Sequence, residues 1–127
     1  MTKYLPFIFD TNCFMTNQKC FIVAGENIAF LTAFLNSSLF KFCFRDNFPE
    51  LQGGTREVSK IFFDKIPVAT VDSKTNRIFE KRILEIQELK KRKTDTKIKE
   101  IEVDHLIFDL YQLSAQEKAN IGFIEIR

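Results

Sequence analysis

The residues best suited to contact a partner form a polar stretch around two glycines, Gln52-Gly53-Gly54-Thr55-Arg56. Glycine allows unusual backbone angles and a close approach to a partner. Glutamine can make two hydrogen bonds to adenine, arginine can do the same to guanine, and threonine reaches a base or a phosphate. The stretch is therefore a candidate for reading DNA base edges. The alternative is a tight Gly-Gly turn whose side chains face water.

Nearby cations could support such a site. Lys60 lies just beyond the stretch, and Lys41 and Arg45 are one helical turn apart, so they share a helix face. Cations in this arrangement could hold phosphates, which position a protein on DNA without reading its sequence. An ordinary solvated stripe is the alternative. The basic run at residues 90–93 has the same two interpretations, because cations also suit the end of a helix.

The sequence offers no catalytic constellation. Glu102 and Asp104 are two positions apart on a predicted helix, so they face different directions. The only histidine, His105, is interpreted as a partly buried packing residue, and no metal or cofactor is expected in this chain. Three cysteines without a Cys-x-x-Cys pair indicate neither a disulfide framework nor a zinc site. They are interpreted as small buried residues in a reducing cytoplasm.

Charge is distributed unevenly along the 127 residues. Residues 74–100 hold ten basic and five acidic side chains, whereas residues 101–127 hold two basic and five acidic ones. Such neighbouring segments can bind a polyanion or pair with each other. We see no signal peptide and no membrane span, so a cytoplasmic protein without membrane contact is expected.

The first part of the chain predicts a small α+β body. Apolar, β-branched and aromatic residues at Leu5–Asp10 and Cys20–Ala24 predict short antiparallel strands. Asn27 is a candidate N-cap for an apolar helix from Ile28 to about Arg45. Val58–Val68 is interpreted as a helical turn followed by a strand.

The second part predicts helices. Phe79, Ile83 and Ile86 repeat at helical spacing, and a second helix follows the break at residues 94–96. Ser114 and Glu117 have the spacing of a capping box, which predicts a short third helix ending near residue 126. The expected fold class is therefore α+β: a small antiparallel sheet with a packed apolar helix at residues 1–72, followed by a helical hairpin and a short final helix at 73–127, together one compact unit.

Four stretches in order resemble a known family. They are residues 4–24, residues 31–44, residues 48–68 and residues 100–121, and the last contains Leu-Tyr-Gln-Leu-Ser-x-x-Glu at residues 110–117. This order resembles the TaqI-like specificity domain at the C-terminal end of type IIG restriction-modification enzymes, whose usual ending is Leu-Tyr-x-Leu-Thr-x-x-Glu. The resemblance covers nearly the whole chain.

The resemblance implies sequence-specific binding of double-stranded DNA. Full-length members resemble fusions of a nuclease, an adenine-N6 methyltransferase and this recognition domain, and the parent enzyme would use S-adenosylmethionine and Mg²⁺. The chain departs from that pattern because it has no Asn-Pro-Pro-Tyr motif, no glycine-rich cofactor loop and no nuclease cluster. It is therefore expected to be a fragment or a separate specificity piece, with methyltransferase and nuclease domains as partners.

Another hypothesis is a protein-interaction module without DNA affinity. Its amphipathic helices would pair between subunits and bury Phe79, Ile83, Ile86 and Leu110. An independent enzyme has little support from the residues present.

Overall fold

A computed structural model describes residues 7–11, 23–44 and 64–124 of the chain. The helices in these ranges are α1 (Ile28–Asn36), α2 (Ser38–Cys43), α4 (Ser73–Lys91), α5 (Lys97–Leu110) and α6 (Ala115–Ile121). No strand occurs among the described residues. The predicted antiparallel sheet, and with it the α+β class, is therefore wrong, because this part of the chain is helical.

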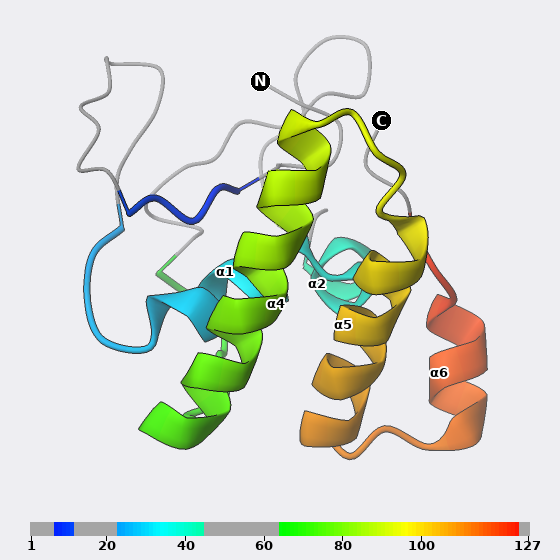
Figure 1. Cartoon of the computed structure of the whole chain (residues 1–127). Helices are drawn as coiled ribbons and strands as arrows, with labels where there is room; N and C mark the ends of the chain where they lie inside the picture. Colours follow the sequence, from blue (N-terminus) through cyan, green and yellow to red (C-terminus); the bar gives the residue numbers. More distant parts are fainter. Residues whose placement is uncertain (1–6, 12–22, 45–63, 125–127) are drawn as a thin grey trace, which may run out of the picture.

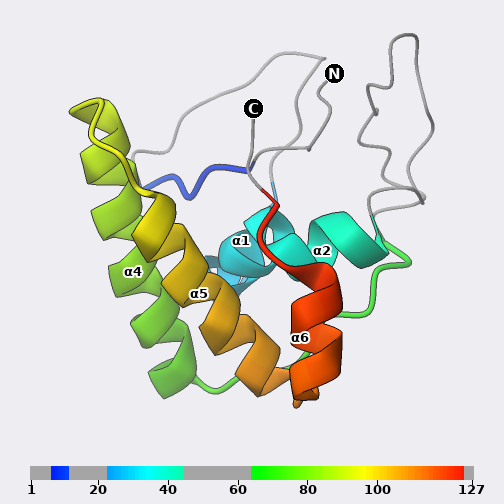
Figure 2. The ribbon, with the colours of Figure 1, turned by 90° about the vertical axis from the view of Figure 1, so that its right-hand side faces the viewer.

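The helices pack around a hairpin formed by α4 and α5. These two helices run antiparallel, and α1 and α2 lie behind them in Figure 1, where α1 contacts α4 and α2 contacts α5. Figure 2 shows that α6 folds back from the end of α5, and it contacts α2. The helical C-terminal half that the sequence predicted is therefore present, with a short final helix.

Aromatic side chains fill the core between these helices. The Phe34 ring stacks on Tyr111 with centroids 5.5 Å apart, and it meets the edge of Phe40 at 5.8 Å. Phe30 meets Phe79 at 5.1 Å, so residues from both sides of the proposed boundary at residues 72 and 73 share one core. Phe42 lies outside this core and is 55% exposed.

The single apolar helix predicted over residues 28–45 is two helices. The backbone of Ser37 is extended, with φ −72° and ψ 158°, and its hydroxyl accepts a hydrogen bond from the Phe40 N–H. Ser37 is therefore the N-cap of a new helix, a role in which serine is favoured. The start at Ile28 is confirmed, but Asn27 makes no cap hydrogen bond with its side chain, which donates instead to the Val71 carbonyl at 2.9 Å.

The first predicted strand has no regular structure at residues 7–10, where two helix side chains bond its backbone. Phe7 N–H donates to Asn36 Oδ1 at 3.0 Å, and Asn36 Nδ2 donates to the Phe7 carbonyl at 2.8 Å. Gln87 bonds the N–H and the carbonyl of Phe9 in the same way, both at 2.9 Å. We call Asn36 and Gln87 the carboxamide pair. These side-chain amides make the hydrogen bonds to the backbone that a neighbouring strand makes in a sheet.

The predicted second and third strands differ in a similar way. Val23 and Ala24, the described end of the second, are exposed and have no regular structure. In the segment before α4, residues 66–70 are also irregular, and Ala69 N–H donates to the Tyr111 hydroxyl at 3.0 Å. The boundary expected between residues 72 and 73 is the start of α4, because Asp72 is the N-cap of that helix.

The capping box at the start of α6 is confirmed. Glu117 N–H donates to Ser114 Oγ at 3.2 Å, and Ser114 N–H donates to Glu117 Oε2 at 2.7 Å. The helix ends at Ile121 rather than near residue 126, because Gly122 takes a positive φ of 63° and closes the last turn.

Candidate functional site

Most of the DNA-contact residues that the sequence predicted lie outside the described residues. This holds for Gln52, Gly53, Gly54, Thr55, Arg56, Lys60 and Arg45. Of that set, only Lys41 lies within the described residues. The structure therefore does not test whether the predicted residues lie close together.

Lys41 lies in the interior at α2. Its side chain is 7% exposed, and the ammonium Nζ donates to the Ile124 carbonyl at 2.9 Å. Burial lowers the pKa of Lys41, and the negative charges of Asp104 and Glu100 oppose that shift. A phosphate contact by Lys41 stays a prediction. It would require the ammonium to leave the Ile124 carbonyl, so the burial favours a structural role.

Asp104 of α5 joins the start of α2 to the C-terminal segment. Its Oδ1 accepts from Ser38 N–H at 2.9 Å and its Oδ2 from Ser38 Oγ at 2.5 Å. Ser38 Oγ in turn accepts from Ile124 N–H at 2.9 Å. Burial raises the pKa of Asp104, although these bonds and the nearby Lys41 oppose the shift. A carboxylate here also satisfies a free N–H at the positive end of a helix.

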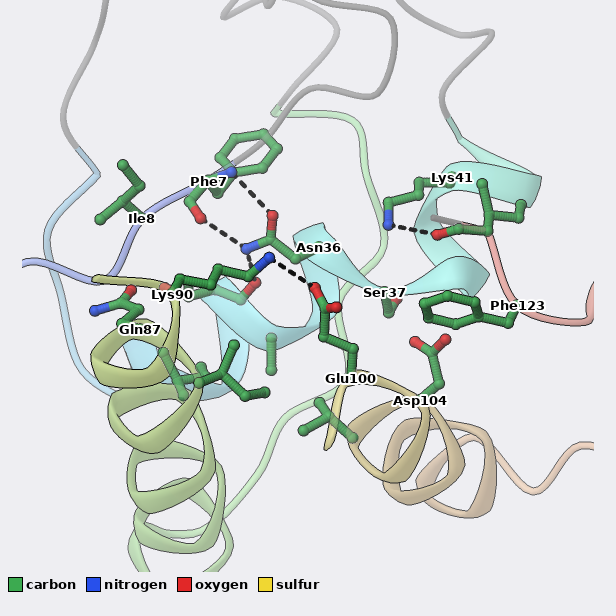
Figure 3. Close-up of a pocket in the computed structure, with 16 residues that line it drawn as sticks. Phe7, Ile8, Asn36, Ser37, Lys41, Gln87, Lys90, Glu100, Asp104 and Phe123 are labelled. Atoms are coloured by element: carbon green, nitrogen blue, oxygen red, sulfur yellow. Dashed lines mark hydrogen bonds and ion pairs between the residues drawn. The ribbon is translucent and has the colours of Figure 1, made fainter. Parts of the chain in front are cut away.

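A pocket of about 230 Å³ opens beside this network, among α1, α2, α4, α5 and the segments that carry Phe7 and Phe123 (Figure 3). Apolar side chains form much of its wall, including Ile83, Val103 and Phe123. Lys90 and Glu100 form an ion pair with Nζ and Oε1 3.3 Å apart. The other Glu100 oxygen accepts from the Thr96 hydroxyl at 3.1 Å. The volume could hold a small apolar molecule or several waters.

The pocket holds no arrangement typical of an enzyme. Both oxygens of Asp104 accept hydrogen bonds from Ser38, and no nucleophile pairs with a base among the lining residues. In the described ranges, no group of three or more histidine, cysteine or acidic residues could hold a metal ion.

Ion pairs link α4 and α5 along the hairpin, and that of Arg82 and Glu102 joins the basic segment to the acidic one. Arg82 bonds Glu102 at 2.9 Å, and Lys99 bonds Glu85 at 2.5 Å. These pairs are partly exposed, so each contributes little to stability. Part of the local positive charge is therefore neutralised within the chain. Glu102 and Asp104 indeed face different directions, with Glu102 exposed and Asp104 buried.

Two other residues differ from expectation. Cys43 is exposed at the end of α2 rather than buried. His105 is also exposed, although its ring meets the edge of Phe108 at 6.1 Å.

Sequence reasoning missed the polar residues that join the segments, above all Ser38, Asp104 and the carboxamide pair. Asp104 gave a signal, because it occupies the same face of α5 as the buried Ile107 and Phe108. A charged residue at a core position predicts a buried partner. The partner itself lies 66 positions away and has no signature in the sequence.

No helix in the described ranges is long and apolar enough to cross a membrane. No protein-family model, no curated protein and no solved structure matches the chain.

Proposed function

We propose that the chain is a sequence-specific DNA-recognition domain, a C-terminal part of a type II restriction-modification enzyme. It would position double-stranded DNA for methylation or cleavage by domains that this chain does not contain. The observation that carries the proposal is the polar stretch at residues 52–56, with two glycines between side chains suited to adenine and guanine edges. The resemblance to the TaqI-like specificity domain is the reason for interpreting that stretch as a DNA contact.

The helical body is suited to present such a stretch. Residues 45–63 connect α2 to the segment before α4, and the described residues on both sides are anchored. Phe44 packs against Phe34 and Phe40 with centroids 6.2 Å away from each. On the other side, Ile66 packs against the core and Ala69 bonds Tyr111. Binding residues are commonly carried on connections that a rigid scaffold positions.

The chemistry of each side chain determines the DNA contact that we assign to it. Gln52, Thr55 and Arg56 would read base edges, while Arg45 and Lys60 would hold phosphates. Lys41 would contribute through the scaffold, given its burial. S-adenosylmethionine and Mg²⁺ would bind to the methyltransferase and nuclease domains of the parent protein, in the cytoplasm.

Self-association through the C-terminal helices is the alternative. Phe79 and Ile83 would have to be buried between subunits, but they are 2% and 7% exposed within the chain's own core. Partly buried Ile86 and Leu110 also pack against that core. These contacts favour the DNA proposal, because the predicted dimer face is already occupied.

Selection from a random duplex library with the full chain tests the proposal. We expect enrichment of a short motif. Arg56→Ala should lose the preference at particular base pairs of it, because a good bidentate contact discriminates by about 1–3 kcal/mol. Arg77→Ala, an exposed arginine on α4, is the matched control and should retain the motif. Failure of the wild-type chain to enrich any motif would refute the proposal.

A further inference from the structure

The loop between α4 and α5 concentrates positive charge at one end of the hairpin. Residues 90–99 contain six basic residues and one acidic residue, Asp95. We call residues 91–97 the hairpin tip; in Figure 1 it stands at the upper end of α4 and α5. Lys91, Lys93 and Lys97 of the tip are exposed.

Backbone hydrogen bonds fix the shape of the tip. Thr94 N–H donates to the Leu89 carbonyl at 3.0 Å, and Lys93 N–H donates to the Lys90 carbonyl at 3.0 Å. Lys93 has a left-handed φ of 56°. Together these features form a Schellman motif, which closes the end of a helix. Thr96, 5% exposed, secures the start of α5 by bonding Glu100.

The six basic residues at positions 90–99 differ in their partners. Lys90, Arg92 and Lys99 form ion pairs with acidic side chains of α4 or α5. Lys97 lies over the Phe123 ring, with its Nζ 5.9 Å from the ring centroid. Among the described residues, Lys91 and Lys93 form neither an ion pair nor such a contact. Asp95, the acidic residue of the tip, accepts from the Lys97 backbone N–H at 3.0 Å. Two exposed ammonium groups therefore stand on a fixed turn without a neutralising partner in the described chain.

We infer that the hairpin tip is a second contact with DNA, in which Lys91 and Lys93 bind the phosphate backbone. The inference rests on the proposed function, because it names a contact of the same complex with the same duplex. Ammonium groups act on phosphate as point charges, so this contact reads no bases and adds affinity to every sequence alike. The fixed turn lowers the cost of ordering the two lysines on binding.

Duplex DNA suits the tip better than an acidic protein does. The tip presents cations on a short convex turn, and the binding of phosphates by such cations releases counterions from DNA. Interfaces between proteins usually bury an apolar centre. Among the described residues of the turn region, Ile98 is the one large apolar residue with a strongly exposed side chain. The charge pattern therefore favours a phosphate backbone.

The test compares two double variants of the full chain. Lys91→Gln with Lys93→Gln changes the tip, and Lys74→Gln with Lys81→Gln removes the same charge from exposed lysines elsewhere on α4. Neither Lys74 nor Lys81 forms an ion pair with another described residue, so the two variants are matched. Affinity for the selected duplex and for a scrambled duplex is measured by fluorescence anisotropy at several salt concentrations.

We expect the tip variant to bind both duplexes more weakly at low salt. The slope of log K against log salt should be less steep by about 2, because each phosphate contact contributes about 0.9. Between about 50 and 200 mM salt the wild type should thus lose about tenfold more affinity than the tip variant. The α4 control should keep the wild-type slope, and both variants should keep the preference for the selected duplex.

A third variant separates charge from folding. Lys93→Gly suits the left-handed φ and should raise the thermal midpoint, yet it should flatten the salt slope by about 1. If Lys93→Gly binds DNA more weakly although it is more stable, the loss of the lysine charge, and not unfolding, is the cause of the weaker binding.

The outcomes distinguish the two proposals. If the wild-type chain selects a duplex but the tip variant and the α4 control have the same slope of log K against log salt, the tip contact is wrong. The proposed function is unaffected by that result. A wild-type chain without DNA affinity overturns both. Binding to vesicles of phosphatidylglycerol and phosphatidylcholine is measured for the same variants. If the tip variant binds these vesicles more weakly than the wild type but binds DNA equally well, the tip is a membrane contact and the DNA inference is wrong.

Discussion

At the level of single residues, the carboxamide pair shows how side chains replace a strand. Asn36 is 29 positions from Phe7, and Gln87 is 78 positions from Phe9. Each amide group donates to the carbonyl and accepts from the N–H of the same residue, which satisfies both of its backbone groups. Asn36 also donates to the Thr32 carbonyl at 3.0 Å within its own helix. The pattern of apolar residues at 7 and 9 predicted extended backbone, but the identity of its partners depends on contacts between distant positions.

Replacement of Asn36 should weaken the docking of the first segment. Asn36→Leu removes both bonds to Phe7 and should lower the free energy of unfolding by roughly 1–3 kcal/mol. Asn36→Asp can still accept from the Phe7 N–H, but its second oxygen cannot donate to the Phe7 and Thr32 carbonyls, so this variant should also lose stability. Urea denaturation measures both, with Gln116→Leu on exposed α6 as a control expected to change stability by roughly 0.5 kcal/mol or less. Equal stability of Asn36→Leu and this control would contradict the role of the amide.

Asp104 should make stability depend on pH. Its raised pKa means that the folded chain binds the proton more tightly than the unfolded chain does. The free energy of unfolding therefore gains a favourable contribution as pH falls through the raised pKa toward the ordinary range of aspartate. Asp104→Asn lacks this titration, so the wild type should gain stability relative to that variant on acidification.

Denaturation of both proteins at a series of pH values measures this difference. A difference between wild type and Asp104→Asn that stays constant over the whole acidic range would show that burial does not control the Asp104 carboxyl.

At the level of elements, helix ends were predicted well where the signal is local. The box of Ser114 and Glu117 spans four positions, and it forms as expected. The break at Ser37 was missed, because the preceding and following residues are apolar at helical spacing. The break is stabilised in part by Asp104, which bonds the first N–H of α2 from the distant helix α5. Such long-range capping has no local pattern.

The capping box should contribute measurably to stability. Ser114→Ala removes the hydroxyl that accepts the Glu117 N–H, and it should cost about 1 kcal/mol. Ser73→Ala, at the exposed first position of α4, removes a hydroxyl outside the N-cap position and serves as the control. Thermal denaturation of the two variants checks the difference, and a larger effect at Ser73 than at Ser114 would argue against the box.

The end of α5 gives a prediction of opposite sign. Gln112 has a left-handed φ of 55° after the last turn of that helix. Glycine adopts this conformation without the steric cost that a side chain brings, although it loses more entropy on folding. Gln112→Gly should therefore stabilise the chain by up to about 1 kcal/mol in urea denaturation. A clear loss of stability would show that the glutamine side chain makes a contact that matters more than the turn.

For the whole molecule, the segments around Phe7 and Ile124 are held on one helical body. Asn36 and Gln87 hold the first segment, and Ser38 and Lys41 hold Ile124 of the second. Figure 3 shows the bonds of Asn36 and Lys41. The sequence predicted the C-terminal helices and the aromatic core. It did not predict that polar residues would replace the sheet, because their partners are far away along the chain. The candidate reading stretch at residues 52–56 was found from residue types alone and stays a prediction.

We propose that this helical body presents a stretch that distinguishes DNA sequences. The most direct measurement compares the affinity of the full chain for a duplex carrying the selected motif with its affinity for a scrambled duplex, over a range of salt concentrations. We expect tighter binding of the selected duplex at every salt concentration, by about 1–3 kcal/mol for each base pair that is read. Equal affinity for the two duplexes, or no affinity for either, would contradict it.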